Sequence, residues 1–361
     1  MKKFIAFFSI ITSLLLCLSL ASCGVKGDRF DLNAFGSPVH VEVYEKKLTK
    51  EVKNKISDLL SSLEEEFSLD KSNSFTVSFN SAGKNHKVPL SSTAKEILQS
   101  CKDYYAFSST LFNPTILPLK KLWKFSFDTK VDNAHFTPPT MEQINEVLNS
   151  GVLDFDKVNI DNDEVYKTVD GLTLDFGGML KGYACDEVAK ILLNAGYDSG
   201  YVNLGSSSMR ILSSSKLSVR HPENSTSTIL DINCENIKNF AVSTSGDYEK
   251  FYTFEGERYS HIINPLTGAP YQTNLHSVTV LGKDGAFLDA ISTTLCLLDF
   301  SVQMKNDNPL VYMMNKIVEK DDSVMIFAVY SDGQDKFLIT NKMENTHFTL
   351  LDSTYEVFTI S

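Results

Sequence analysis

Three oxygen-bearing side chains stand at helical spacing in the C-terminal third of the chain. Asp289, Ser292 and Thr293 occupy positions i, i+3 and i+4, so they share one face of the helix predicted between residues 284 and 300. Oxygen ligands arranged in this way suit a hard cation such as Mg²⁺. Taken alone, however, the pattern fits an ordinary polar helix face better than a metal site.

A second segment, residues 172–182, combines glycines with a lysine. Alternating apolar residues at 172–176 predict a strand that ends at Gly177-Gly178, and the apolar face of residues 180–192 predicts a helix after it. Such a turn can present backbone N–H groups to a phosphate, and Lys181 would add positive charge where the helix dipole disfavours it. Close strand–helix packing with a solvated lysine would explain the sequence equally well, and no standard nucleotide motif is present.

A histidine stands near a rigid turn in the third segment. His261 precedes Asn264-Pro265, which fixes its position, and with Asp247 nearby it could act as an acid or base or orient a substrate. A lone histidine is more often structural. Ser243 and Ser245 could complete a hydrolase triad with these residues, but the sequence lacks the G-x-S-x-G elbow.

A fourth segment, Leu111-Phe112-Asn113-Pro114-Thr115, places an aromatic ring beside an amide and a proline. These residues could form one edge of a site for a planar ring. A turn packed under the core would have the same sequence, so both interpretations stay open.

The elements that position these segments are predicted from hydrophobic periodicity. Helices are expected at residues 48–67, 91–107 and 140–149, and strands at 39–44, 324–330 and 337–340. Residues 241–249 predict a short apolar strand that runs into a polar loop, and residues 126–139 predict an irregular insertion. We find no internal repeat or low-complexity linker, so the body is predicted to be one mixed α and β unit.

The composition limits the class of protein. The chain has 361 residues, of which 42% are hydrophobic and 22% charged, and its formal net charge is -11. These values exclude a disordered, collagen-like or multi-span membrane protein. The acidic charge argues against nucleic acid as a partner, because nucleic-acid-binding proteins usually carry a basic face.

The N-terminus predicts secretion and lipidation. A positive Met1-Lys2-Lys3 start precedes an uncharged apolar run, which is typical of a signal peptide at residues 1–22. Leu20-Ala21-Ser22-Cys23 resembles the bacterial lipobox, in which Cys23 becomes the lipidated N-terminus; an uncleaved membrane anchor is the alternative. Cleavage removes Lys2 and Lys3 and changes the net charge from -11 to -13. We expect a lipidated tether at residues 23–30 and an extracytoplasmic, membrane-anchored lipoprotein.

Four further cysteines follow Cys23 in the mature chain: Cys101, Cys185, Cys234 and Cys296. Their spacing matches no metal site. Cys185 and Cys296 stand in apolar helical patterns and are expected to be buried small hydrophobic residues. The sequence leaves open whether any of the four forms a disulfide.

Taken together and in order, these segments resemble the ApbE family, the FAD:protein FMN transferases. The matching segments are 111–115 (family pattern A-F-D-P-T), 175–184 (D-L/F-G-G/A-I/V-A-K-G-Y-A), 202–205 (V-N-L-G), 243–248 (T-S-G-D-Y), 260–268 (S-H-I-I-D-P-x-T-G) and 289–293 (D-A-L-S/A-T). Each motif is weak alone, but their order and spacing make the resemblance specific. It extends from about residue 35 to about residue 300.

The resemblance implies an α+β fold, with one domain at residues 31–361, and a Mg²⁺-dependent enzyme. Such enzymes cleave the pyrophosphate of FAD, transfer FMN to a Thr or Ser hydroxyl of a target protein and release AMP. A redox membrane subunit is the expected target. A metal ion would neutralise the pyrophosphate and polarise the phosphorus for attack.

The resemblance also assigns roles by position. The metal ligands would be Asp289, Thr293, Ser292 and the backbone carbonyl of Gly178. The residues that hold FAD would be Phe35, Leu111, Phe112, Asn113, Asp175, Lys181 and Ile263. His261 would act at the reaction centre by orienting the phosphate or the attacking hydroxyl, and Asp247 is a second candidate there.

Several positions depart from the family pattern. They are Phe35-Gly36-Ser37-Pro38 in place of Met-Gly-Thr, Asp70 where tyrosine is common, Asn113 and Asn264 in place of aspartates, Leu180 in place of alanine, and Ser206 in place of glycine. The metal aspartate, the threonine and Lys181 are retained. We therefore expect a divergent but active member, with flavin affinity more affected than the metal site.

Three other functions remain open from the sequence. An FAD pyrophosphatase would use the same site with water as the acceptor and would yield FMN and AMP. A non-catalytic flavin-binding lipoprotein would bind FAD and leave it intact when Mg²⁺ is added. A surface lipoprotein without a ligand would retain no flavin.

Overall fold

The computed structural model describes residues 27–224, 226–248, 250–301 and 308–360. The predicted signal peptide and Cys23 therefore lie outside the described residues. Within these ranges the main sheet has nine strands, in the spatial order β1 (Asp28–Ala34), β2 (Ser37–Val43), β6 (Gly200–Leu204), β7 (Ser208–Ile211), β10 (Phe240–Gly246), β13 (Leu275–Gly282), β14 (Met325–Ser331), β15 (Lys336–Thr340) and β17 (Glu356–Thr359). Each neighbouring pair is antiparallel except β15 and β17.

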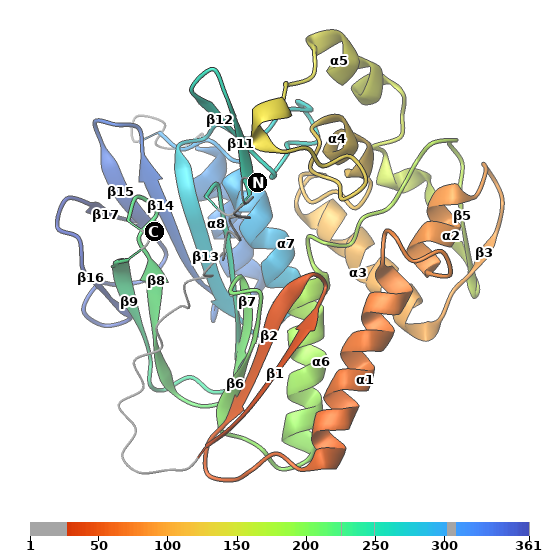
Figure 1. The fold of residues 1–361 in the computed structure, drawn as a ribbon. Coiled ribbons are helices and arrows are strands. Elements are labelled where there is room, and N and C mark those ends of the chain that lie inside the picture. The colour runs from red at the N-terminus through yellow and green to blue at the C-terminus, as the bar shows by residue number, and fades with distance from the viewer. Residues whose placement is uncertain (1–26, 225, 249, 302–307, 361) are drawn as a thin grey trace, which may run out of the picture.

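The remaining elements surround this sheet (Figure 1). The helices are α1 (Lys50–Phe67), α2 (Phe75–Ser81), α3 (Ser92–Phe107), α4 (Leu117–Leu122), α5 (Met141–Asn149), α6 (Leu180–Asn194), α7 (Gly285–Cys296) and α8 (Pro309–Lys320), with short 3₁₀ turns η1 (Asn133–His135) and η2 (Phe155–Lys157). The smaller strands are β3 (Val88–Pro89), β4 (Val158–Asp161), β5 (Glu164–Lys167), β8 (Ser215–Arg220), β9 (Thr228–Cys234), β11 (Phe251–Phe254), β12 (Glu257–Ser260) and β16 (Phe348–Leu350). The mixed α+β class predicted from the sequence is confirmed.

Helices α1, α6 and α7 cover one face of the main sheet (Figure 1). The apolar stripe of α1 is buried, and Thr49 caps the helix by accepting from the Val52 N–H over 3.3 Å. On α6, the predicted inner face is buried, and Gly196 ends the helix with a φ of 77°. Burial of these stripes creates the largest apolar core, which contains residues from Phe30 to Ile360. A chain that starts after Cys23 therefore retains the whole core.

The opposite face of the sheet is covered by a second, smaller sheet. Strands β16, β9 and β8 pair in that order, and their apolar residues pack against Met209, Phe240 and Phe327 of the main sheet. This second core explains why β7, β14 and most of β10 are buried on both faces. The main sheet is thus a central layer between helices and a small sheet.

A third apolar cluster packs beside the carboxyl end of β10. It joins α4, α5 and the β11–β12 hairpin, with Trp123 donating from Nε1 to the Gly268 carbonyl over 2.7 Å. Phe136 stacks on Tyr252 with ring centroids 4.3 Å apart. The predicted irregular insertion at residues 126–139 thus contributes Phe136 to a core, although η1 is its only regular element among the described residues.

Most of the predicted elements are confirmed, with small shifts at the ends. The helices expected at 48–67, 91–107 and 140–149 are α1, α3 and α5, and each begins one or two residues later because a Thr or Ser caps it. The tether prediction was too long, because residues 28–30 already belong to β1. Within residues 241–249, the strand that was expected to be short continues through Gly246 as β10, so it includes part of the expected loop.

One predicted strand is wrong. Residues 172–176 alternate in type, and Leu172, Leu174 and Phe176 are buried, but the segment pairs with none of the strands that the structure describes. Its backbone bonds elsewhere: the Leu174 N–H donates to Oδ1 of Asn80 over 2.7 Å, and the Asp175 N–H donates to the Pro114 carbonyl over 2.8 Å. Residues 172–176 are therefore extended and partly buried, but their backbone forms no β-ladder with a described strand.

The described cysteines share one kind of environment. Cys101, Cys185, Cys234 and Cys296 are buried free thiols, which confirms the expectation for Cys185 and Cys296. Burial raises the pKa of the Cys234 thiol to about 12. In the described part of the chain, no helix combines the length and the apolar character needed to cross a bilayer.

Candidate functional site

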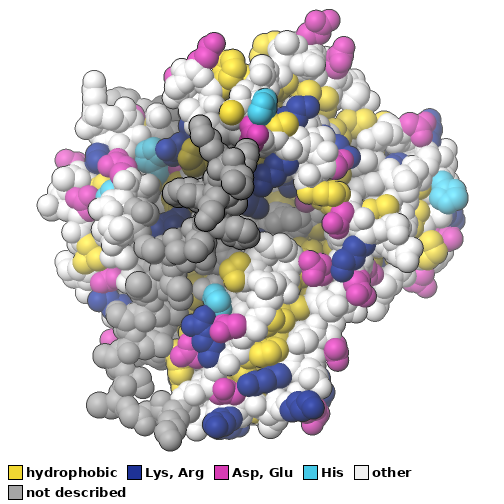
Figure 2. All heavy atoms as spheres, viewed as in Figure 1, with side chains coloured by type: hydrophobic (Ala, Val, Ile, Leu, Met, Phe, Trp, Pro, Cys, Tyr) yellow, Lys and Arg dark blue, Asp and Glu magenta, His cyan; other side chains and the backbone are white. Residues whose placement is uncertain are grey.

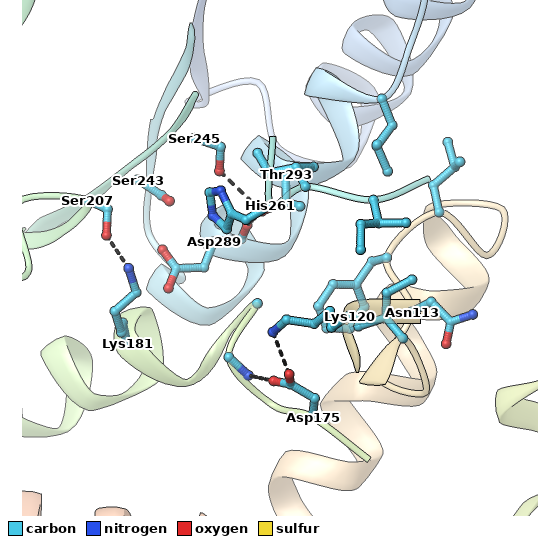
Figure 3. A pocket seen from close by; sticks show the side chains of 18 of the residues that line it. Asn113, Lys120, Asp175, Lys181, Ser207, Ser243, Ser245, His261, Asp289 and Thr293 are labelled. Atoms are coloured by element: carbon cyan, nitrogen blue, oxygen red, sulfur yellow. Dashed lines mark hydrogen bonds and ion pairs between the residues drawn. The ribbon is translucent and has the colours of Figure 1, made fainter. Parts of the chain in front are cut away.

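A cavity of about 150 Å³ opens where β10, the first turn of α6 and the middle of α7 meet the 111–116 and 261–263 segments (Figure 3). Its walls bring together ten of the residues that the sequence assigned to a site. They are Leu111, Phe112, Asn113, Asp175, Gly178, Lys181, His261, Ile263, Asp289 and Thr293. Segments more than 170 residues apart in the sequence therefore converge on one place.

Asp289 extends from α7 into this cavity and is 6% exposed. Its carboxylate accepts from the Gly182 N–H over 2.6 Å and from the Ser208 hydroxyl over 2.8 and 3.0 Å. Burial raises the pKa of Asp289, and the nearby ammonium of Lys181 and the hydroxyl of Ser243 oppose that shift. A desolvated carboxylate of this kind favours a cation as its partner.

A chain of hydroxyls lies behind Asp289. Ser292 contacts Ser243 over 3.0 Å and Ser245 over 2.8 Å, and Ser245 contacts Thr293 over 3.1 Å (oxygen to oxygen). Thr293 lines the cavity, whereas Ser292 is fully buried and does not. Thr293 is thus available to a ligand, while Ser292 fixes the surrounding hydroxyls.

Lys181 lies in the first turn of α6 and lines the cavity. Its ammonium donates to the Ser207 hydroxyl (Figure 3). The next residue, Gly182, lies directly against α7: a Cβ there would fall 2.0 Å from the Gly285 carbonyl oxygen. This close approach of α6 to α7 places Lys181 and Asp289 on the same cavity wall.

Asp175 forms the opposite wall with a cation that the sequence did not indicate. Lys120 of α4 donates to Oδ2 of Asp175 over 2.5 Å, and the Gly177 N–H donates to Oδ1 over 2.8 Å. Although burial raises the pKa of Asp175, these contacts outweigh it, and the pKa lies below its ordinary value. Asp175 is therefore ionised and holds both the glycine turn and Lys120.

His261 lines the cavity at the end of the β12 strand. Nδ1 contacts the Lys250 carbonyl over 3.1 Å, and because a carbonyl only accepts, Nδ1 carries the proton of the neutral ring. Burial lowers the pKa of His261 to about 3, and the positive charges of Lys250, Lys120 and Lys181 contribute. The ring is neutral at physiological pH, with its Nε2 lone pair available.

Apolar side chains close the remaining wall. Leu111, Phe112, Ile116 and Ile263 line it, and Gly178 faces the ring of Phe112, where an added Cβ would fall 3.3 Å from that ring. A cavity with charged groups on one side and apolar groups on the other suits an amphipathic ligand that carries both an anion and a ring.

Asn113 serves the fold rather than the cavity centre. Its Oδ1 accepts from the Thr115 N–H over 2.8 Å and from the Thr115 hydroxyl over 2.6 Å, while its Nδ2 donates to the Leu153 carbonyl over 2.8 Å. In Figure 3 the amide is turned away from Lys120 and Asp289. The amide, unlike a carboxylate, can donate to Leu153.

We expect Asn113→Asp to destabilise the fold by about 1–3 kcal/mol, because a carboxylate would face the Leu153 carbonyl without a proton to donate. Urea unfolding measures this. Asn264→Asp is the matched control, since Asn264 Oδ1 accepts from the Leu266 N–H over 2.9 Å, and this contact needs only an acceptor. Equal stability of the two variants would contradict the assignment.

Three assigned residues lie outside the cavity. Phe35 sits in the β1–β2 turn with a φ of 53° and packs against the main core. Asp247 follows β10 and accepts from Nδ1 of His276 over 3.1 Å, with Arg258 3.9 Å away. Ser292 lies behind the wall, as described above. The structure does not bring these three side chains to the centre that Asp289 and His261 share.

Four site residues were missed by sequence reasoning: Lys120, Ser207, Ser208 and Ser245. Ser245 was weighed only as part of a hydrolase triad. Ser207 and Ser208 come two and three residues after the V-N-L-G segment, and that position was the one available signal. Lys120 stands in a short helix after a proline, where nothing in the sequence distinguishes it from a surface lysine.

In the described residues, no group of three or more His, Cys, Asp or Glu side chains is placed to hold a metal. A metal at Asp289 would therefore complete its shell with hydroxyl and carbonyl oxygens and with oxygens of a substrate. Mg²⁺ accepts such a set, because it commonly binds through one or two carboxylates plus substrate phosphates. The donor set around Asp289 and Thr293 fits that ion.

Known proteins are similar to this chain in fold and in sequence. The FAD:protein FMN transferase of Klebsiella pneumoniae is 25% identical over 89% of this chain and 94% of its own length, and that of Escherichia coli K12 is 27% identical over 82% and 84%. The ApbE protein of Thermotoga maritima superposes with a TM-score of 0.71 at 24% identity over 84% of this chain and 94% of that one. The flavin transferase ApbE of Vibrio cholerae gives 0.73 at 20% identity over 87% and 97%.

The sequence profile of the ApbE family matches residues 35–307, which contain every residue that lines the cavity. The order of the motifs, the fold and the family match all agree. This chain belongs to the ApbE family.

Proposed function

We propose that this chain is a Mg²⁺-dependent flavin transferase that moves FMN from FAD to a Thr or Ser hydroxyl of a target protein and releases AMP. The observation that carries the proposal is the cavity in which Asp289, Thr293, Lys181 and His261 face one another. Relatives named FAD:protein FMN transferase match most of this chain and support it.

Asp289 and Thr293 would hold the metal, with the Gly178 carbonyl as a further candidate. When bound, Mg²⁺ supplies charge neutralisation of the pyrophosphate and polarisation of the phosphorus. The Asp289 carboxylate is held in place by the Gly182 N–H and Ser208, so it is oriented before any ligand arrives. Ser245 orients the Thr293 hydroxyl in the same way.

The lysines bind the anionic part of the substrate. Lys181 and Lys120 line opposite walls, and both ammonium groups are fixed by neighbouring oxygens. A pyrophosphate between these walls would receive charge-assisted hydrogen bonds. The apolar wall around Phe112 and Ile263 would take an aromatic ring of FAD.

His261 would accept the proton of the acceptor hydroxyl. The hydroxyl oxygen attacks the phosphorus of the FMN half, the bond between that phosphorus and the bridging oxygen breaks, and AMP leaves with the bridging oxygen. The hydroxyl proton goes to Nε2 of His261, since Nδ1 already donates to the Lys250 carbonyl. Lys181 stabilises the negative charge on the leaving AMP.

The test combines purified protein with FAD and a flavin-accepting domain, with and without Mg²⁺. An acceptor that gains the mass of one FMN only with Mg²⁺, together with AMP release, establishes the transferase. Free FMN and AMP without a mass gain on any accepting domain would indicate a pyrophosphatase. Bound FAD that stays intact would overturn catalysis.

Lys181→Ala is expected to weaken FAD binding by tenfold or more, because a charge-assisted bond to phosphate contributes about 1.5–3 kcal/mol. Quenching of flavin fluorescence on titration measures the dissociation constant. The matched control is Lys121→Ala, whose side chain pairs with Asp128 outside the cavity. Unchanged affinity in Lys181→Ala would remove this lysine from the phosphate site.

We further propose that the protein is a lipoprotein anchored through Cys23 on the extracytoplasmic side of a membrane, with a redox membrane subunit as its target. The lipobox and the charged start of the signal sequence support the anchor. A membrane-bound acceptor would then share a surface with its modifying enzyme, which favours their encounter.

A further inference from the structure

We propose that Lys46, Lys47 and Lys50 form a surface that binds the anionic headgroups of a lipid bilayer and holds the folded body against the membrane. All three side chains are exposed, in the β2–α1 loop and at the first residue of α1. Within the described ranges, none of the three makes an ion pair with a carboxylate. Their charge is therefore available to an outside partner.

This lysine surface lies beside the point at which the described chain begins. The Leu48 N–H donates to Oδ2 of Asp28 over 3.0 Å, and the Lys53 ammonium lies 2.9 Å from the same oxygen. Asp28 is the first residue of β1 and pairs with Val43 at the end of β2. The lysine surface therefore lies close to the N-terminal end of β1. An anchor on the segment before β1 would also keep these lysines close to that anchor.

The tether that we propose is short. Five residue steps separate Cys23 from Asp28, so even a fully extended tether spans about 17 Å. This step rests on the proposed lipid anchor. With acyl chains on Cys23, the loop that carries Lys46 and Lys47 would stay within reach of the headgroups, and the anchored body would sample them at a high effective concentration.

The loop is fixed in a conformation that presents its lysines. The Lys46 ammonium lies 4.5 Å from the centre of the Tyr197 ring, and the Tyr197 hydroxyl donates to the Lys47 carbonyl over 2.9 Å. Lys50 begins α1, where the helix dipole disfavours a cation. This unfavourable interaction between a cation and the helix dipole is offset if the lysines bind negative charge from an outside partner.

The charge of the whole body makes the lysine surface distinct. The mature chain carries a formal charge of -13, so most of its surface is repelled by anionic lipid. Several Lys and Arg side chains, with Asp and Glu side chains among them, lie at the lower end of the molecule in Figure 2, where β2 ends and α1 begins in Figure 1. Lysines near an anionic leaflet are attracted to it, and a body that is already tethered needs only a weak attraction to be oriented.

The orientation that follows leaves the cavity open. Helix α6 runs from the cavity, at Lys181, to the lysine surface, at Tyr197 just beyond its C-terminal end. Its 15 residues span about 22 Å. A bilayer bound at the lysines would therefore lie at the far end of α6 from the cavity, so the acceptor hydroxyl would be modified at a distance above the headgroups.

The experiment uses the chain from Cys23 onward, which retains the whole core, coupled through Cys23 to a maleimide lipid in vesicles. The other four cysteines are buried and do not compete for coupling. An uncharged acylating reagent then modifies lysines, and mass spectrometry gives the rate at each one. The vesicles contain phosphatidylcholine alone or with about 30% phosphatidylglycerol, the probe for an anionic leaflet.

We expect modification of Lys46, Lys47 and Lys50 to slow at least threefold on the anionic vesicles, and about 0.5 M salt to restore it. Internal controls are the exposed Lys71, Lys84 and Lys130, which lie beyond the far end of α1, after α2 and after α4; their rates should not change. Equal rates on both vesicles, or an equal fall at all six lysines, would overturn the proposal.

A charge-reversal variant provides the second measurement. Lys55 is exposed on α1 next to the lysine surface, so we expect anionic vesicles to slow its acylation in the unmodified chain. This protection should disappear when Lys46→Glu, Lys47→Glu and Lys50→Glu are combined. These three side chains are on the surface, so the fold tolerates the changes. Persistent protection of Lys55 in that variant would show that other groups carry the contact.

Discussion

Asp289→Asn is expected to lower Mg²⁺-dependent AMP release from FAD by about 10³-fold, the equivalent of the several kcal/mol that a bound metal contributes. The asparagine keeps the size of the side chain and can still accept from the Gly182 N–H, so the wall of the cavity is retained. The loss of AMP release would thus come from removing the negative charge of the Asp289 carboxylate. Initial rates of AMP release over a range of Mg²⁺ concentrations measure it.

Thermal stability gives a readout independent of turnover. Because burial raises the pKa of Asp289, the folded state holds its proton to higher pH than the unfolded state, so ionisation at neutral pH costs stability. Without Mg²⁺, Asp289→Asn should therefore melt at or above the temperature of the unmodified protein. In the presence of FAD, added Mg²⁺ should raise the melting temperature of the unmodified protein further, but not that of the variant.

The matched control is on the same helix. Asp284 caps α7 by accepting from the Phe287 N–H over 3.0 Å and does not line the cavity, and asparagine caps helices equally well. Asp284→Asn should keep its dependence on Mg²⁺ within about twofold, since a cap-preserving change costs little. Full turnover in Asp289→Asn would place the metal elsewhere.

Periodicity predicted the helices well because burial alone selects their faces. The stripe of α1 and the inner face of α6 are apolar at every helical repeat, and both pack on the sheet as expected. The same reasoning failed at residues 172–176. Alternation reports burial on one side, but whether a ladder forms depends on the partner, and here Asn80 and Pro114 take the backbone bonds instead.

The cavity could be predicted only in part, because its contacts join distant segments. The helical spacing of Asp289 and Thr293 and the unusual place of Lys181 were visible locally, and all three line the cavity. The pairing of Asp175 with Lys120 joins residues 55 positions apart, and that of Asp289 with Ser208 joins residues 81 apart. No local pattern encodes such pairs, so the groups that hold the site in place emerge from the fold.

The departures from the family pattern also became interpretable only in the fold. Asn113 stands where the family has an aspartate, yet here the amide bridges Thr115 and Leu153. From the sequence, the departures taken together were expected to affect flavin affinity more than the metal site. The contacts show that it maintains the loop that places Phe112 and Leu111 against the cavity.

His261→Ala is expected to lower kcat by about 10²–10⁴-fold, which is the usual contribution of a positioned general base. FAD affinity should change little, because the phosphate contacts come from lysines. The pH profile adds a specific expectation. Since burial lowers the pKa of His261 to about 3 in the free protein, the ring stays neutral there as pH falls from 8 to 5, and kcat/KM, which reports the groups of the free enzyme, should not fall through an ordinary histidine pKa near 6.5.

Two variants make this expectation decisive. His261→Gln retains a hydrogen-bonding side chain but cannot take up a proton, so it should stay as slow as His261→Ala if proton transfer is the role. His135→Ala changes an exposed histidine on η1 and should leave kcat within about twofold, as surface changes usually do. If His261→Gln restores the rate, the side chain only orients the acceptor hydroxyl, and the proton leaves by another route. An acid limb of kcat/KM near pH 6.5 that vanishes in His261→Gln would instead mean that burial and the neighbouring lysines do not lower the pKa of the ring.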